Sequence, residues 1–198
     1  FINEVDTLLV LLVIFSLLVL GIIDDKISIK PLSKSLVSML IFLTFLSIRI
    51  DYQIIDLRFE TFNFSVDLFR LSLIFTIFCF VILQILFNMY DGINLQSAIY
   101  YSVILIYLIL VNKNNNFSFF CSLTLINLVF FSVYNYKQKI FLGDNGVYIF
   151  SFILSLLIIK TYQNNYTNFF AEEIIIILFI PFIDMMRLFI VRILKNKN

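Results

Sequence analysis

Residues 68–87 read LFRLSLIFTIFCFVILQILF, a stretch in which Arg70 is the single charged residue. A helix that crosses a bilayer needs about 20 predominantly apolar residues, and this stretch meets that length. Its apolar side chains follow one another without the two-residue alternation of a membrane β-barrel strand. Because backbone polar groups inside a bilayer must be satisfied within the segment, we predict a membrane-spanning α-helix here.

The rest of the chain has the same apolar character. Of its 198 residues, 62% are hydrophobic and 14% are charged, and the mean hydropathy is +1.03. A soluble domain is closer to about half apolar and about a quarter charged, so this composition excludes a soluble globular fold and a disordered chain. The net charge of +1 argues against a nucleic-acid partner, which requires a clustered basic surface. We expect one integral membrane domain over residues 1–198, surrounded by the lipid bilayer.

Further apolar runs bounded by polar residues predict an all-α, polytopic transmembrane helical bundle of about seven spans. Residues 50–66 differ, because apolar and polar side chains alternate there as they do in a half-buried strand. We therefore expect a small extracytoplasmic β-hairpin in this region. The expected spans are residues 7–23, 35–50, 68–87, 97–111, 117–133, 146–159 and 174–191.

The distribution of lysine and arginine predicts the orientation of the spans. Seven spans place the loops near residues 24–34, 88–96 and 134–145 on the same side as the C-terminal tail, and this side carries the larger share of basic residues. Basic residues are enriched in the cytoplasmic loops of membrane proteins. We expect these three loops to face the cytoplasm.

Of the thirteen acidic residues, eight lie on the other side, and four of the remaining five lie in these three loops. Asp24, Asp25, Asp91 and Asp144 each lie at the end of an expected span. Any one of them could simply cap a helix or stabilise a turn, but acids from three loops on one membrane face favour a functional site. The chain has no histidine, so we expect a hard cation on oxygen ligands, Mg²⁺ or Mn²⁺, with water and substrate phosphate completing its shell.

Four segments, in order along the chain, form a recognisable pattern. They are Asp24-Asp25 with Pro31 and Lys34, Asn88-Met89-Tyr90-Asp91-Gly92, Gly143-Asp144-Asn145-Gly146, and Pro181-Phe182-Ile183-Asp184 with Arg192. This pattern resembles the polyprenyl-phosphate N-acetylhexosamine-1-phosphate transferase family, which is glycosyltransferase family 4-like. The family includes undecaprenyl-phosphate GlcNAc-1-phosphate transferases and the phospho-N-acetylmuramoyl-pentapeptide transferase.

Two positions depart from the family pattern. Ser38 stands where the family has glutamine. Asn94 replaces the second aspartate of the middle motif, and an amide can ligate or hydrogen-bond but cannot act as a base. Some sugar-transferring members resemble this sequence in having asparagine there, so we interpret Asn94 as variation between subfamilies.

The resemblance implies an activity and a set of site residues. A sugar 1-phosphate, of the N-acetylhexosamine class, would pass from a UDP-sugar to polyprenyl (undecaprenyl) phosphate with release of UMP. This reaction starts lipid-linked glycan synthesis for the cell envelope, as in peptidoglycan or O-antigen formation. The implied metal ligands are Asp144 and Asp91, the implied catalytic residues are Asp24, Asp25 and Asp91, and the implied substrate-binding residues are Asn88, Asn94, Lys34, Gly143 and Arg192.

The resemblance also implies partners and a location. The substrates are UDP-N-acetylhexosamine and polyprenyl phosphate, the protein is a multi-pass protein of a bacterial-type cytoplasmic membrane with its active site on the cytoplasmic face, and a homodimer is a possible assembly. The family has earlier spans and a histidine-containing loop after its arginine motif, whereas this sequence runs from Phe1 to Asn198. We therefore expect a domain incomplete at both ends, and activity in the longer protein rather than in this fragment alone.

Other classes of function fit parts of the sequence. Residues 90–91 and 142–144 are similar to the two motifs of intramembrane aspartyl proteases, but Phe141 replaces the first glycine of the second motif. That mechanism also gives no role to the aspartate pair at 24–25. A transporter would place polar groups near the middle of its spans, whereas here they gather at one interface. A purely structural membrane subunit predicts no dependence on Mg²⁺ and no effect of changing Asp144.

Overall fold

The computed structural model describes residues 4–92, 95–112, 115–164 and 169–194. These residues form a bundle of α-helices with a two-stranded sheet, so the predicted all-α transmembrane architecture is confirmed, and each expected span corresponds to one helix. The elements are α1 (Glu4–Ile27), α2 (Pro31–Ile48), the 3₁₀ turn η1 (Ile50–Tyr52), β1 (Asp56–Phe59), β2 (Phe64–Asp67), the 3₁₀ turn η2 (Phe69–Leu71), α3 (Ser72–Tyr90), α4 (Gln96–Val111), α5 (Asn115–Tyr136), α6 (Gly143–Asn164) and α7 (Ala171–Leu194).

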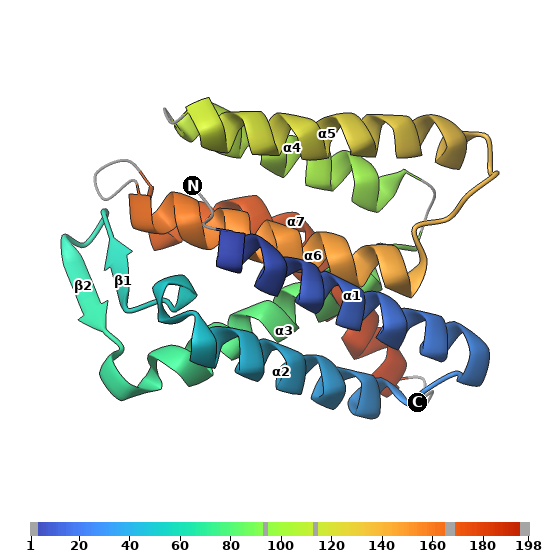
Figure 1. Ribbon diagram of the computed structural model, residues 1–198, viewed down its shortest axis with the longest axis horizontal. Helices are drawn as coiled ribbons and strands as arrows, with labels where there is room; N and C mark the ends of the chain where they lie inside the picture. The colour runs from blue at the N-terminus through green and yellow to red at the C-terminus, as the bar shows by residue number, and fades with distance from the viewer. Residues whose placement is uncertain (1–3, 93–94, 113–114, 165–168, 195–198) are drawn as a thin grey trace.

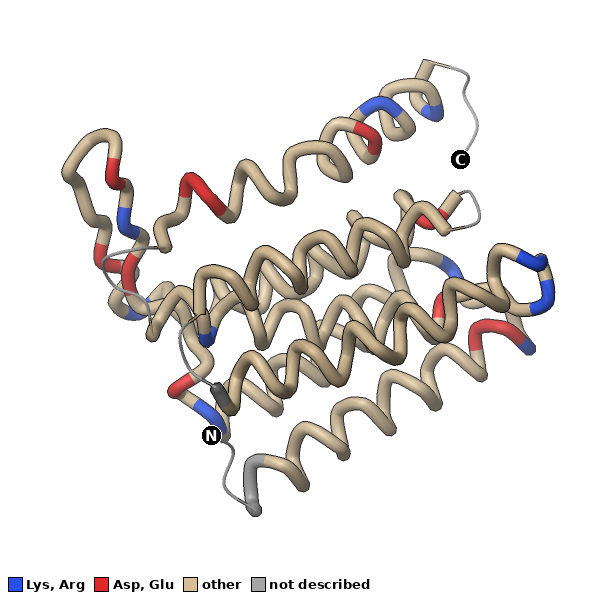
Figure 2. Tube along the Cα trace, turned by 90° about the horizontal axis from the view of Figure 1, so that it is seen from above, with Lys and Arg blue, Asp and Glu red and all other residues tan. Residues whose placement is uncertain are grey.

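The described helices form a bundle suited to a membrane. Six of them are long and apolar enough to cross one, whereas α4 has 16 residues, fewer than the about 20 of a perpendicular crossing. In Figure 1, α4 and α5 form a layer above α6, and α2 and α3 lie below it. Charged residues lie toward the two ends of the bundle, and the zone between them is almost free of charge (Figure 2). A hydrocarbon layer requires this separation, because charges inside it are costly.

Helix α6 forms the centre of the bundle. It packs against α1, α3 and α4 and is the most buried of the six long helices, whereas α7 is the least buried. Three buried rings meet here: Phe42 lies 5.2 Å from Phe80 and stacks at 5.9 Å on Phe152. Because lipid tails are as apolar as these side chains, close packing rather than exclusion from water holds such helices together.

Pro181 lies inside α7. Proline has no N–H, so the carbonyl oxygen of Ile177, four residues earlier, loses its helical donor. The Tyr100 hydroxyl of α4 donates a hydrogen bond of 2.8 Å to this same oxygen. A side chain of another helix thus supplies the bond that proline removes, which is one way in which membrane helices tolerate proline.

The predicted hairpin is present at the end of the bundle opposite the loop between α1 and α2 (Figure 1). Strands β1 and β2 are antiparallel, with Leu57 opposite Val66. The hairpin begins later than residue 50, because Ile50–Tyr52 form the turn η1. The Arg49 guanidinium donates from Nε to Asp51 across this turn at 2.9 Å, which favours a turn over a strand.

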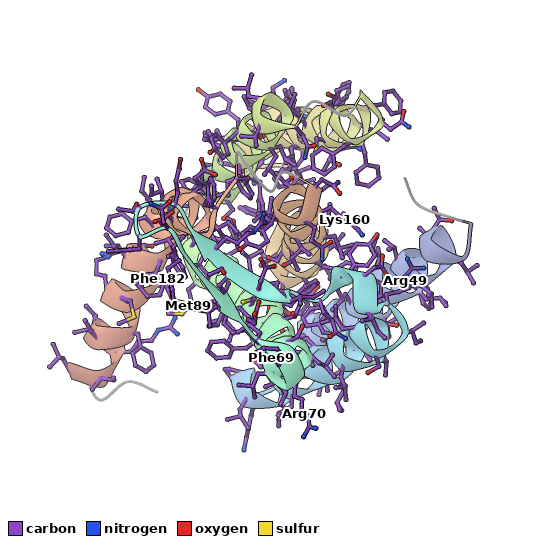
Figure 3. The ribbon with its side chains drawn as sticks, turned by 90° about the vertical axis from the view of Figure 1, so that its left-hand side faces the viewer. Arg49, Phe69, Arg70, Met89, Lys160 and Phe182 are labelled. Atoms are coloured by element: carbon purple, nitrogen blue, oxygen red, sulfur yellow. The ribbon has the colours of Figure 1, made fainter. Side chains whose placement is uncertain are left out.

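Figure 3 shows the hairpin end of the molecule. Arg49 and Lys160 lie on the same side of the bundle, whereas Arg70 points away from it. Arg49 Nη2 lies 2.9 Å and Lys160 Nζ 3.2 Å from the same Asp51 oxygen, Oδ2. These contacts connect η1 to the end of α6.

Candidate functional site

The structure brings the aspartate motifs together at the end of the bundle opposite the hairpin. Asp24 lies near the end of α1, Lys34 in the first turn of α2 and Asp144 in the first turn of α6. The Lys34 ammonium nitrogen lies 2.8 Å from Asp24 Oδ2 and 2.5 Å from Asp144 Oδ2. One cation therefore joins carboxylates from two of the predicted loops.

Asp24 is the most enclosed acid of this cluster, with 8% of its side chain exposed. Its Oδ1 accepts a hydrogen bond of 2.8 Å from the backbone N–H of Ile29, and its Oδ2 accepts from Lys34. The first bond fixes the carboxylate on the turn between α1 and α2. A buried carboxylate needs such partners, because its charge is costly away from water.

Asp144 is positioned by the start of α6. Gly143 has a φ of +61°, a left-handed conformation that glycine adopts without steric cost. The positive end of the helix dipole favours the carboxylate that follows. The Asn88 amide Nδ2 donates to Asp144 Oδ1 at 3.0 Å, and the Tyr148 hydroxyl donates to Oδ2 at 3.3 Å. The sequence analysis missed Tyr148, although its spacing of four residues from Asp144 on a helix was a signal.

Asp25 is oriented by Asn145 of α6, a residue to which the sequence analysis gave no role of its own. The Asn145 amide Nδ2 donates a hydrogen bond of 2.9 Å to Asp25 Oδ2. This contact depends on Gly21, because a Cβ there would lie 1.9 Å from Asn145 Oδ1 and 2.9 Å from its Cα. Glycine is therefore required where α1 and α6 approach each other, and a lone glycine in an apolar helix was the available signal.

Asp91 follows the last turn of α3 and is half-buried. Burial raises the pKa of this carboxyl, and the negative charge of Asp144 acts in the same direction. Within the described residues no lysine or arginine forms an ion pair with Asp91. Among the described residues the carboxylates of Asp24, Asp91 and Asp144 therefore outnumber the one ammonium, that of Lys34, that forms ion pairs in this cluster.

The remaining predicted residues lie apart from this cluster or outside the described residues. Arg192 is exposed in the last turn of α7. Asp184 pairs with Arg187 at 2.7 Å, as their i, i+3 spacing predicts. The predicted role of Asn94 concerns a residue outside the described ranges.

The chemistry of the cluster fits a hard divalent cation. In the part of the chain that the structure describes, no three acidic or thiol side chains lie close enough to hold a metal ion by themselves. Mg²⁺ usually takes one or two protein carboxylates and completes its shell with water and substrate phosphate, so the donor set is sufficient. In the structure these carboxylates are paired with the Lys34 ammonium, which lies between Asp24 and Asp144.

Comparison with known proteins identifies one family. A family model described as glycosyl transferase family 4 matches residues 7–162. This range contains the cluster residues Asp24, Lys34, Asp91 and Asp144 and ends before α7. A comparison with curated proteins gives no significant match.

Proposed function

Because the chain belongs to glycosyl transferase family 4, we propose that it transfers an N-acetylhexosamine 1-phosphate from a UDP-sugar to polyprenyl phosphate. An oxygen of the lipid phosphate forms a bond to the sugar-linked phosphorus, and the bond from that phosphorus to the bridging oxygen of the diphosphate breaks, which releases UMP. The observation that carries this proposal is the cluster of Asp24, Lys34 and Asp144 at one end of a membrane bundle. A soluble nucleotide and a lipid head group can meet at that boundary.

The two substrates are both anionic, so the site must offset their repulsion. Asp144 and Asp91 would hold Mg²⁺ or Mn²⁺, which when bound would neutralise phosphate charge and align the displacement. Lys34 adds a positive charge of the protein itself, and an ammonium binds phosphate as a point charge. Its place in the first turn of α2 puts this charge near the membrane boundary.

The aspartate pair has separate tasks in this proposal. Asp24 is enclosed and fixed by Ile29 and Lys34, so it stays in place as substrate binds. Asp25 is exposed and is oriented by Asn145, so the head group of a lipid can reach it. Asp25 is therefore the better placed of the two to accept a proton from the lipid phosphate.

The substrate contacts would come from the start of α6 and from α3. The first N–H groups of α6 have no partner within the helix, and Gly143 at its start is exposed, which favours an anionic phosphate there. Asn88 is oriented by Asp144 and could contact the nucleotide. Asn94 and Arg192 stay predictions from the family resemblance.

The proposal includes a place in the cell. The protein would lie in a bacterial-type cytoplasmic membrane with its cluster on the cytoplasmic face, where UDP-sugars occur. Its product would enter cell-envelope glycan synthesis, of which peptidoglycan and O-antigen are examples. The larger share of basic residues in the loops of this face supports the orientation.

The test uses membranes that contain the full-length gene product, labelled UDP-N-acetylglucosamine, undecaprenyl phosphate and Mg²⁺. We expect lipid-linked sugar and UMP in equal amounts, and loss of both with a chelator. Asp144→Ala should lower turnover by about 10²–10³-fold, whereas Asp67→Ala, at an exposed position of β2, should leave it unchanged. Normal turnover by Asp144→Ala would contradict the ligand assignment, and peptide cleavage without sugar transfer would replace the proposal with an aspartyl protease.

A further inference from the structure

The Lys34 ammonium occupies the position where a cation would be most stabilised in this cluster. It lies between Asp24 Oδ2 and Asp144 Oδ2, at 2.8 Å and 2.5 Å. The other oxygen of each carboxylate also accepts a hydrogen bond, from Ile29 N–H and from Asn88 Nδ2. All four carboxylate oxygens of Asp24 and Asp144 are therefore satisfied by donors of the protein itself.

This arrangement is incompatible with direct binding of a second cation at Asp144 Oδ2. A divalent ion binds oxygen at about 2.0–2.1 Å in the case of Mg²⁺ and repels an ammonium group at that range. Lys34 and a metal ion therefore compete for Asp144 Oδ2, and each weakens the binding of the other. Lysine is suited to such an exchange, because its charge sits on a flexible four-carbon chain.

We propose that Lys34 is a built-in counter-ion, which holds Asp24 and Asp144 together when no divalent cation is bound and leaves Asp144 when Mg²⁺ or Mn²⁺ binds. The inference rests on the metal-dependent function proposed above and deepens it. The released ammonium stays tethered to α2 beside the site. Cation binding thereby exposes a positive charge for a substrate phosphate, so that metal and substrate bind in an ordered and mutually supporting way.

Competition between the Lys34 ammonium and a divalent cation predicts two measurable effects of removing the ammonium. Removal of the ammonium removes a competitor, so the divalent cation should bind more tightly. It also leaves Asp24 and Asp144 facing each other with like charge, so the metal-free protein should lose stability. Both effects arise from one contact, and a merely structural role for Lys34 predicts the second effect without the first.

The experiment measures Mn²⁺ binding by electron paramagnetic resonance in purified protein, in parallel with thermal unfolding. Lys34→Met should bind Mn²⁺ at least about tenfold more tightly than the wild type. In chelator it should unfold at a lower temperature than the wild type, and added Mn²⁺ should raise its unfolding temperature by more. Lys30→Met is the matched control, because Lys30 is exposed one turn earlier and its removal changes the net charge equally. It should bind Mn²⁺ like the wild type.

The double variant Lys34→Met with Asp144→Asn locates the effect. It should bind Mn²⁺ no more tightly than Asp144→Asn alone, because the carboxylate for which the two cations compete is gone in both; tighter binding in the double variant would contradict competition at Asp144. If Lys34→Met is too unstable without metal, Lys34→Gln, which keeps a hydrogen-bond donor but no charge, gives the same comparison.

The outcomes separate this inference from the function on which it rests. Equal Mn²⁺ affinity in the wild type and the Lys34 variants, with saturable binding in both, would overturn the inference alone. An absence of saturable binding in all variants would overturn the metal site and the inference with it. If Lys30→Met increased the affinity for Mn²⁺ as much as Lys34→Met does, the increase would be a general effect of net charge, and this result would also overturn the inference.

Discussion

The two charged ends of the bundle (Figure 2) differ in how their acidic side chains are paired. At the hairpin end Asp51 is contacted by two cations, Arg49 and Lys160. At the motif end, in contrast, Asp24 and Asp144 share the single ammonium of Lys34. The Asp51 carboxylate is therefore paired with more than one cation, whereas at the motif end two carboxylates share one ammonium, a local deficit that a bound cation would offset.

The two ends also differ in solvent access. The Asp51 side chain is 46% exposed, and the Asp24 side chain is 8% exposed. Water screens an exposed pair, which is worth at most about 1 kcal/mol. An enclosed excess of carboxylates instead opposes folding, so the motif end must be held by packing, as at the close approach of α1 to α6 at Gly21. The exposed ion pairs of Asp51 therefore add little to stability, so charge can support the hairpin end mainly through buried residues such as Arg58, whereas we expect the charges of the motif end to serve a ligand.

Matched aspartate variants test this difference with the largest expected effect. Asp24→Asn keeps the shape of the side chain and removes its charge at the motif end, so turnover should fall by about 10²–10³-fold. Asp51→Asn makes the same chemical change at the hairpin end and should alter turnover by less than about threefold, since its contacts are exposed. Both are measured as initial rates of lipid-linked sugar formation per amount of folded protein.

The comparison between the ends would fail if Asp51→Asn reduced turnover as much as Asp24→Asn does. Size-exclusion profiles of both variants serve as the control, because a misfolded Asp24→Asn protein would lose turnover for a different reason.

Local sequence features were sufficient to predict most of the fold. The apolar run at residues 68–87 predicts a helix that the structure places at Ser72–Tyr90. The boundary of α2 was misplaced, because Pro31 favours the first position of a helix and starts α2 before the apolar run begins. The alternation in residues 50–66 predicted a hairpin but could not show that Arg49 and Asp51 close a turn at its start.

The candidate site was predicted as a set of residues but not as a set of contacts. The number of spans and the distribution of lysine and arginine were sufficient to predict which loops lie on the same membrane face. The pairing of Lys34 with Asp144, 110 residues later, depends on how α2 packs beside α6, and residue spacing does not contain that information. The same limit applies to Tyr100 and the Ile177 carbonyl, which meet only because α4 approaches α7 at Pro181.

Substitution of Arg58 at the hairpin end is expected to lower stability without loss of turnover. Its guanidinium stacks over the Tyr162 ring at 4.1 Å, donates to the Tyr162 carbonyl oxygen and approaches Asp56 at 3.4 Å. Arg58→Met should lower the free energy of unfolding by about 2–3 kcal/mol, because a charge-assisted hydrogen bond and a cation–π contact are lost. Denaturant unfolding in detergent micelles measures this change.

Arg70→Met is the matched control for Arg58→Met. Arg70 is exposed and points away from the bundle (Figure 3), so its loss should change the free energy of unfolding by no more than about 0.5 kcal/mol. Equal destabilisation by the two variants would show that net charge, rather than the contacts of Arg58, supports the hairpin end. A strong loss of turnover in folded Arg58→Met would contradict the interpretation that Arg58 stabilises the fold and takes no part in the reaction.

The smallest expected effect is a pH dependence of stability with opposite sign at the two ends. Hydrogen bonds from Arg49 and Lys160, against the opposing effect of burial, hold the pKa of Asp51 below its ordinary value. Asp51 therefore adds stability above the unfolded carboxyl pKa of about 3.9, and that stability is lost as pH falls through the lowered folded value. Burial raises the pKa of Asp91, so its favourable contribution is present below pH of about 3.9 and is lost as pH rises through the raised folded value.

Thermal unfolding of Asp51→Asn and Asp91→Asn from about pH 2 to about pH 7, in chelator, measures both signs, because the Asp51 change lies below the unfolded pKa and the Asp91 change above it. Relative to the wild type, Asp51→Asn should lose stability as pH rises, whereas Asp91→Asn should gain it, each by no more than about 1 kcal/mol after solvent screening. The chelator is needed because a bound cation would stabilise the ionised form of Asp91 and reverse its sign. If both variants changed in the same direction, the opposite pKa shifts of Asp51 and Asp91 would be contradicted.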